Sequence, residues 1–138
     1  MMIKSVLILG AGIEQVDCYN SCKKLNIKTL GVDKNINSPG FKISNYKIIE
    51  SIYKPKFILK KIKKFKNLKI IGILAVGVDC PKTLKDLSKN LNLDILKNNL
   101  YKKVGDKIKL YKYLDKFGLS PEYKILKKKK EIFLFLKK

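Results

Sequence analysis

Residues 6–17, VLILGAGIEQVD, place four apolar residues directly ahead of a Gly-Ala-Gly turn. A buried strand that runs into a glycine turn and then a helix is typical of nucleotide-binding α/β units. A dinucleotide fingerprint has a third glycine three residues after the second, and this sequence has Gln15 at that position. The stretch therefore predicts strand–turn–helix geometry and leaves open what the turn binds.

Beyond this stretch, short apolar runs alternate with amphipathic segments, a pattern typical of an α/β fold with a parallel sheet. The run at residues 70–76 is apolar throughout, which predicts a strand buried on both faces. Proline suits the first turn of a helix, so Pro55 and Pro81 each open one. Strands are expected at residues 5–9, 28–32, 46–50, 70–76 and 93–96, and helices at 13–25, at 55–65 and from 81 onward.

After residue 96 the rhythm of the sequence changes. Gly105-Asp106 caps a helix predicted over residues 107–117, and Gly118 ends it. Shorter elements are predicted around it: a helix at 98–104, a strand at 122–126 and an apolar, helix-like end at 127–138. We expect a Rossmann-like domain of about five strands over residues 1–96, followed by residues 97–138 as a separate part.

The formal net charge is +21, and all 32 basic residues are lysine. Such a charge is compatible with a nucleic-acid or membrane partner. Arginine, the usual reader of guanine edges, is absent, and the lysines are spread along the whole chain. The sequence therefore favours a solvated lysine surface, with no specific nucleic-acid partner and no membrane partner.

No apolar run reaches the roughly 18 residues of a membrane helix. The apolar start of the chain runs into Glu14 without a small-residue cleavage site, so a cytoplasmic protein is expected. The chain has three cysteines, Cys18, Cys22 and Cys80, and no histidine. Buried thiols in a reducing compartment are a better interpretation than a metal site.

The glycine turn is the first candidate binding site. Gly10 and Gly12 precede a predicted helix, whose free N–H groups favour an anion. Asp33 lies about 20 residues further on, where a dinucleotide enzyme holds the ribose. Glu14 and Gln15, however, place a carboxylate and an amide where a pyrophosphate would lie. The alternative is that the glycines only form a tight turn.

The loop after the fourth predicted strand is the second candidate. Ligands of an open parallel sheet bind beyond the carboxyl ends of its strands. We therefore expect Gly77 and Asp79 to converge with Gly10 and Gly12 on one crevice. The alternative for Asp79 is a cap for the helix that starts at Pro81.

Four segments, in this order, resemble the ATP-grasp family of carboxylate–amine ligases, which includes biotin carboxylase, the carbamoyl phosphate synthase large subunit and purine-pathway ligases. The last segment is similar to the family's D-K-x(6–7)-L-x(3)-G-[hydrophobic]-x-P element. The segments are LILGAGIEQ (7–15), LGVDKNINSPGF (30–41), ILAVGVDCP (73–81) and GDKIKLYKYLDKFGLSPEY (105–123).

The resemblance implies an N-terminal Rossmann-like domain whose glycine loop lines an acceptor-substrate crevice and does not bind NAD. It implies that Lys107 reaches the ATP phosphates. It assigns no catalytic or metal-binding residue to this chain. The substrate contacts that it implies are Gly10, Gly12, Glu14, Gly77 and Asp79.

The family's later ATP-binding lysine, its glycine-rich lid and its Mg²⁺-binding Glu/Asn pair lie downstream of positions matching residue 138. The resemblance therefore implies a chain that stops just after the first strand and helix of the ATP-grasp domain. ATP and Mg²⁺ would be held by the full-length parent, and neither firmly by this chain. A missing domain or partner chain and a small carboxylate substrate are implied, and a homodimer is left open.

Three functions follow as hypotheses. The first is the substrate-side domain of an ATP-dependent carboxylate–amine or carboxylate–thiol ligase that works through an acyl phosphate, inactive alone. The second is a free-standing NAD(P)-binding protein that uses Gly10, Gly12 and Asp33. The third is a lysine-rich module that binds nucleic acid or an anionic membrane.

Overall fold

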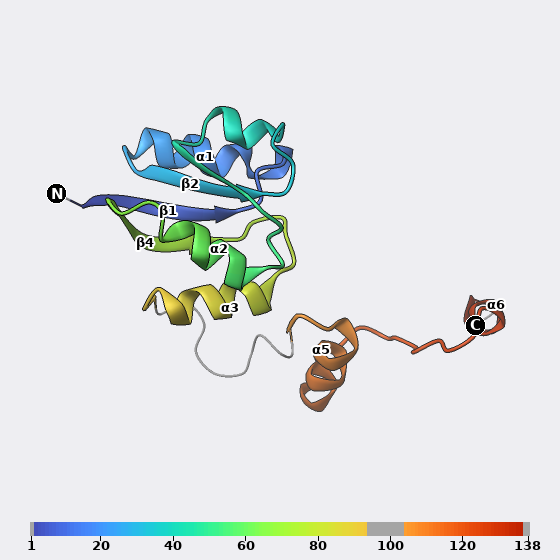
Figure 1. The fold of residues 1–138 in the computed structure, drawn as a ribbon. Coiled ribbons are helices and arrows are strands. Elements are labelled where there is room, and N and C mark those ends of the chain that lie inside the picture. The colour runs from blue at the N-terminus through green and yellow to red at the C-terminus, as the bar shows by residue number, and fades with distance from the viewer. Residues whose placement is uncertain (1, 94–103, 137–138) are drawn as a thin grey trace.

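The computed structural model describes residues 2–93 and 104–136, and its centre is one parallel sheet in the order β3-β2-β1-β4 (Figure 1). The first strand is an inner strand of the sheet, since it pairs with β2 on one side and with β4 on the other. This confirms the predicted α/β fold with a parallel sheet. The strands are β1 (Ile3–Leu9), β2 (Lys28–Asp33), β3 (Tyr46–Ile49) and β4 (Leu68–Leu74).

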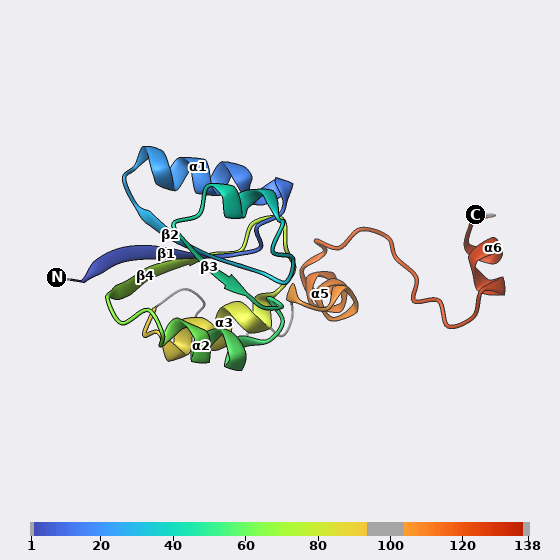
Figure 2. The same ribbon diagram turned by 45° about the horizontal axis from the view of Figure 1, so that its top comes forward.

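Helices cover both faces of this sheet, with α1 on one side and α2 and α3 on the other (Figure 2). Alternate residues of β1 therefore enter different cores: Leu7 and Leu9 join one apolar cluster, and Ile8 joins the other. The helices are α1 (Val16–Lys24), which follows a 3-10 turn η1 (Ile13–Gln15), then α2 (Pro55–Ile62) and α3 (Pro81–Asn90); a second 3-10 turn, η2 (Pro39–Lys42), lies beside α1.

The prediction that the fourth strand is buried on both faces is wrong. Ile70 and Ile73 enter the core under α2 and α3, but Ile71 and Leu74 are 40% and 37% exposed. β4 is the last described strand at its edge of the sheet, and its register with β1 shifts between Ser5 and Val6. The apolar run therefore forms a half-covered strand.

The chain leaves the layered part after α3, and α5 and α6 lie beyond the sheet in both views (Figures 1 and 2). Asp106 caps α5 as predicted, since its Oδ1 accepts hydrogen bonds from the N–H groups of Ile108 (3.0 Å) and Lys109 (3.2 Å). Gly118 ends this segment in a left-handed conformation (φ +64°). The elements are α5 (Lys107–Leu114), the 3-10 turn η3 (Asp115–Phe117) and α6 (Lys130–Leu136).

Two predictions about this part differ from the structure or fall outside it. Residues 122–126 form no strand; they have no neighbouring strand to satisfy their backbone groups, and most of them are exposed. The strand predicted at 93–96 and the helix predicted at 98–104 fall almost entirely on residues 94–103, outside the described part. Among the described residues, no helix is long and apolar enough to cross a membrane.

Candidate functional site

The four parallel strands end at one edge of the sheet, and the loops that follow them gather there. Two cavities open among these loops, with volumes of about 220 Å³ and about 570 Å³. Gly10, Gly12 and Asp33 line the smaller cavity, and Asp79 lines the larger one. Tyr53 lines both, so the two cavities meet at its side chain.

The glycine turn is held by hydrogen bonds within the protein. Gly10 has φ +95°, a conformation that favours glycine. Its N–H donates to the carbonyl of Val32 (2.8 Å), and its carbonyl accepts from the hydroxyl of Tyr19 (2.9 Å). The N–H of Ala11 donates to Oδ2 of Asp33 (2.9 Å). Both backbone donors are thus occupied by the protein itself.

Asp33 supports the turn with one oxygen and its own loop with the other. While Oδ2 accepts from Ala11, Oδ1 accepts from the N–H of Asn35 (2.9 Å). In a dinucleotide site this carboxylate accepts hydrogen bonds from the ribose hydroxyls, and here each of its oxygens already accepts one from the backbone. This geometry does not favour the NAD(P) hypothesis.

Gln15 occupies the concave side of the turn. Its side chain is 3% exposed, and its Oε1 lies 2.9 Å from where a Cβ on Gly10 would stand and 3.1 Å from where one on Gly12 would. Its Nε2 donates to the carbonyl of Val76 (2.6 Å). The residue at the third fingerprint position therefore fills the turn and connects it to the loop after β4.

Glu14 and Gly77 lie against each other at the same place. Gly77 has φ +65°, and Oε2 of Glu14 lies 2.5 Å from where a Cβ on Gly77 would stand. A larger residue at position 77 would displace the Glu14 carboxylate. Gly77 therefore lies against the glycine turn, as predicted, whereas Asp79 lines the larger cavity and not the one that Gly10 and Gly12 line.

Asp79 is exposed at the rim of the larger cavity. The interpretation of Asp79 as a helix cap is wrong, because the N-cap residue of α3 is Cys80 and no side chain makes a capping bond there. The structure gives the Asp79 carboxylate no hydrogen bond or ion pair within the described residues. Burial raises the pKa of the neighbouring Cys80 thiol to about 11, and the negative charge of Asp79 is the smaller cause of this shift.

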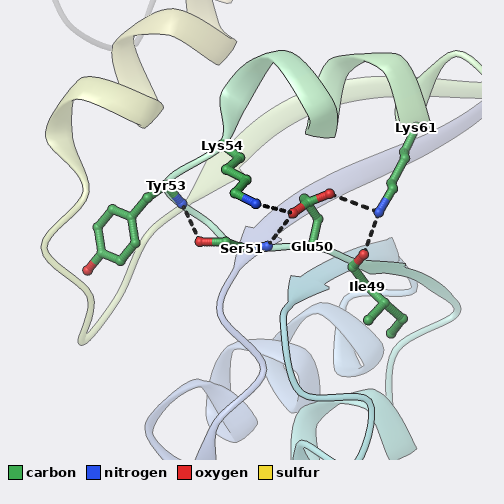
Figure 3. A network of polar contacts seen from close by, with 6 residues as sticks. All are labelled: Ile49, Glu50, Ser51, Tyr53, Lys54 and Lys61. Carbon is green, nitrogen blue, oxygen red and sulfur yellow. Dashed lines mark hydrogen bonds and ion pairs between the residues drawn. The ribbon is translucent and has the colours of Figure 1, made fainter.

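The loop after β3 carries Tyr53 between the two cavities, and Glu50 fixes this loop (Figure 3). Oε1 of Glu50 accepts from the N–H of Ser51 (3.0 Å), and Oε2 accepts from Nζ of Lys61 (3.0 Å). The hydroxyl of Ser51 in turn accepts from the N–H of Tyr53 (3.3 Å). The Tyr53 side chain points away from this network and is 65% exposed, which leaves its ring available to a ligand.

The start of α5 reaches the larger cavity through Gly105, Asp106 and Lys109. Nζ of Lys109 pairs with Oδ2 of Asp106 (3.2 Å), and the hydrogen bonds to Lys109 lower the pKa of this carboxyl. Lys107, the expected ATP ligand, is exposed and lines neither cavity. The structure does not bring Lys107 together with the glycine turn.

Several site residues could not be singled out from the sequence. Ser51 and Tyr53 follow β3 without a recognisable motif, and Gln15 stands out only as a departure from a fingerprint. Lys34 and Lys82 line the smaller and larger cavities, but nothing distinguishes them from the other lysines of the chain. Among residues 2–93 and 104–136, no three cysteine or acidic side chains gather to hold a metal ion.

No protein-family model matches this sequence, and no curated protein matches it. Solved structures do share its fold. Phosphoribosylglycinamide synthetase from Anaerococcus prevotii superposes with a TM-score of 0.70 at 24% identity, over 97% of this chain and 34% of that one. N5-carboxyaminoimidazole ribonucleotide synthetase from Thermotoga maritima gives a TM-score of 0.66 at 21% identity, over 97% and 36%.

N5-carboxyaminoimidazole synthetase from Staphylococcus aureus, solved in complex with ADP, gives a TM-score of 0.64 at 16% identity. This match covers 83% of the present chain and 29% of that one. The present chain thus spans about a third of the length of the synthetases that it resembles. Its parallel sheet and flanking helices are a fold that these synthetases also contain.

Proposed function

We propose that this chain is the substrate-side part of an ATP-dependent carboxylate–amine or carboxylate–thiol ligase of the ATP-grasp family. The crevice at the carboxyl ends of the strands receives the acceptor substrate. The observation that carries the proposal is the Asp79 carboxylate, which lines a cavity of about 570 Å³ at this edge of the sheet and makes no hydrogen bond or ion pair with another described residue. The likeness to phosphoribosylglycinamide and N5-carboxyaminoimidazole ribonucleotide synthetases supports it.

The charges at the crevice suit a small polar substrate. Asp79 offers a carboxylate to an amine, and Lys82, which lines the same cavity, offers a cation to a carboxylate or phosphate. Tyr53 adds an exposed ring beside them. The glycine turn contributes a close backbone wall and not an anion site, because Gln15 fills its concave side.

Among the described residues, no three cysteine or acidic side chains gather. A ligase of this type activates its carboxylate with Mg-ATP, and phosphoryl transfer depends on metal ions and cations positioned around the phosphates. We therefore assign Mg-ATP binding to another part of the parent enzyme. A role for Lys107 at the ATP phosphates remains part of this proposal, and it requires the exposed start of α5 to face that other part.

The test is a titration of the ¹⁵N-labelled 138-residue chain followed by NMR. The probes are phosphoribosylglycinamide, N5-carboxyaminoimidazole ribonucleotide, glycine and NAD, each at millimolar concentration. We expect shifts at Gly10, Gly12, Tyr53 and Asp79 with at least one of the first three probes. Asp79→Asn should weaken that binding about tenfold, and Asp86→Asn, the same change at a position within α3, should not.

Two results would contradict the proposal. One is ATP turnover by the purified chain. The other is the absence of crevice shifts with the three acceptor-like probes. Saturable shifts at the turn with NAD, lost in Asp33→Asn, would support the NAD(P) hypothesis in its place.

A further inference from the structure

We propose that Gln15 is the positioning residue of the crevice: it holds the loop after β4 against the glycine turn, and it closes that turn to a diphosphate. The role as a substrate crevice rests on the function proposed above. The positioning of the loop after β4 by Gln15 is argued from contacts within the protein and does not depend on a ligand.

Gln15 is the polar link between two loops that are far apart in sequence. It lies in η1, and its Nε2 donates to the carbonyl of Val76, 61 residues later in the chain. The two loops follow β1 and β4, which pair side by side in the sheet (Figure 1). One side-chain amide therefore bridges the point where the sheet opens toward a ligand.

This link determines where the next residues of the loop lie. Val76 is followed directly by Gly77, which lies against Glu14, and Val78 lines the smaller cavity. Asp79 comes next and lines the larger cavity. Without the bond at Val76, the loop loses the anchor that keeps these residues at the edge of the crevice.

The same amide excludes a diphosphate from the turn. A pyrophosphate in a dinucleotide site approaches the backbone where glycine has no side chain. Here Oε1 of Gln15 lies 2.9 Å from where a Cβ on Gly10 would stand and 3.1 Å from where one on Gly12 would, so it occupies the space beside both glycines. The N–H groups of Gly10 and Ala11 are already bonded to Val32 and Asp33. The glycine turn is thus closed to a pyrophosphate.

The positioning is tested without ligand by ¹⁵N relaxation of Gly77 and Val78. In the native protein we expect order parameters near 0.85, the value of a rigid backbone. Gln15→Met keeps the volume and removes the donor, so the values should fall below about 0.6. Order parameters of Ser51 and Tyr53, in the loop that Glu50 fixes, should not change and serve as the internal control.

Gln15→Glu separates the hydrogen bond from the packing. A protonated glutamic acid donates to the Val76 carbonyl, and an ionised one does not. Burial favours the protonated form and raises the pKa of such a side chain. The order parameter of Gly77 in this variant should therefore rise to the native value as the pH falls below about 6. In Gln15→Met the order parameter of Gly77 should stay low at every pH.

The exclusion of a diphosphate from the glycine turn is tested with ADP-ribose, which carries a pyrophosphate and no nicotinamide. The native chain should show no shifts at Gly10 and Gly12, and Gln15→Gly should bind ADP-ribose at least about tenfold more tightly. Thermal melting of each variant verifies that it is folded.

Unchanged order parameters in Gln15→Met would overturn the positioning role. Binding of ADP-ribose at the turn of the native chain, or equal affinity in Gln15→Gly, would overturn the exclusion. None of these results depends on whether the crevice binds an acceptor, so failure of the proposed function remains distinguishable from failure of this inference.

Discussion

Oδ2 of Asp33 accepts a hydrogen bond from the backbone N–H of Ala11, at 2.9 Å, and so connects the ends of the first two strands. In a dinucleotide-binding site, the glycine turn contacts the pyrophosphate of the cofactor and the acidic residue contacts its ribose. Here they bind each other. This hydrogen bond is therefore a structural brace between the ends of β1 and β2.

Replacing Asp33 should destabilise the fold. In Asp33→Ala the buried N–H of Ala11 loses its acceptor, which costs about 1–3 kcal/mol, whereas the exposed N–H of Asn35 can bond to water. Urea unfolding should show a decrease of this size in the free energy of unfolding. Asp17→Asn, a change at an exposed carboxylate on α1, is the control. Equal stability of the two variants would show that the brace contributes nothing.

The hydroxyl of Tyr19 stabilises the glycine turn after β1. It is buried and donates to the carbonyl of Gly10 (2.9 Å), and burial together with the Asp33 charge raises its pKa, so the proton needed for the bond is retained. Tyr19→Phe should lower the free energy of unfolding by about 1 kcal/mol. Tyr53→Phe removes a hydroxyl that makes no hydrogen bond to the described part of the chain and should leave stability unchanged. A Tyr19→Phe variant as stable as this control would contradict the expectation.

The sequence is a good guide to elements whose determinants are local. The strands β1, β2 and β3 follow from their apolar runs. The Asp106 cap and the Gly118 stop follow from the chemistry of single residues, and the structure contains both. The approach of Gly77 to the turn of Gly10 and Gly12 follows from the rule that parallel strands end at one edge, but the same rule placed Asp79 in that crevice and it lines the larger cavity.

The sequence predictions fail where the structure of a segment depends on contacts with residues that are distant in sequence. Whether an apolar strand is covered depends on its place in the sheet, and β4 lies at the edge of the described sheet with Leu74 partly exposed. Residues 122–126 have strand-like composition and no strand to pair with. The role of Gln15 depends on Val76, 61 residues away, and no local pattern encodes that distance.

Glu50 should make the loop before α2 sensitive to acid. Its bond from Lys61, followed by that from the Ser51 N–H, lowers its pKa below the ordinary value of 4.5. A carboxyl with a lowered pKa contributes stability that is present above its unfolded pKa and lost as the pH falls through the folded one. The melting temperature should therefore drop more steeply below about pH 4.5 in the native chain than in Glu50→Gln.

The control for this prediction is Glu122→Gln, at an exposed position of the C-terminal part. It should follow the native pH profile. If Glu50→Gln also follows it, the ion pairs with Lys61 (3.0 Å) and Lys54 (3.9 Å) contribute only what exposed pairs usually do, which is little.

Cys80 should give the fold a matching sensitivity to base. Its thiol is 5% exposed at the start of α3, and burial, with the Asp79 charge second, raises its pKa from the ordinary 9.0 to about 11. A raised pKa gives stability that is complete below the unfolded value and lost as the pH rises toward the folded one. Between pH 9 and 11 the native chain should lose about 1.4 kcal/mol per pH unit from this group.

The many lysines of the chain also titrate in this range, so the informative quantity is a difference between variants. The free energy of unfolding of the native chain minus that of Cys80→Ala should be constant up to about pH 9 and then fall. Thr83→Ala, at a buried neighbour without a titratable group, should give a constant difference throughout. Asp79→Asn removes the charge beside the thiol and lowers its folded pKa, so the fall should still begin near pH 9 but end at a lower pH and be smaller in total. A flat profile for Cys80→Ala would mean that the thiolate is accommodated at the start of α3.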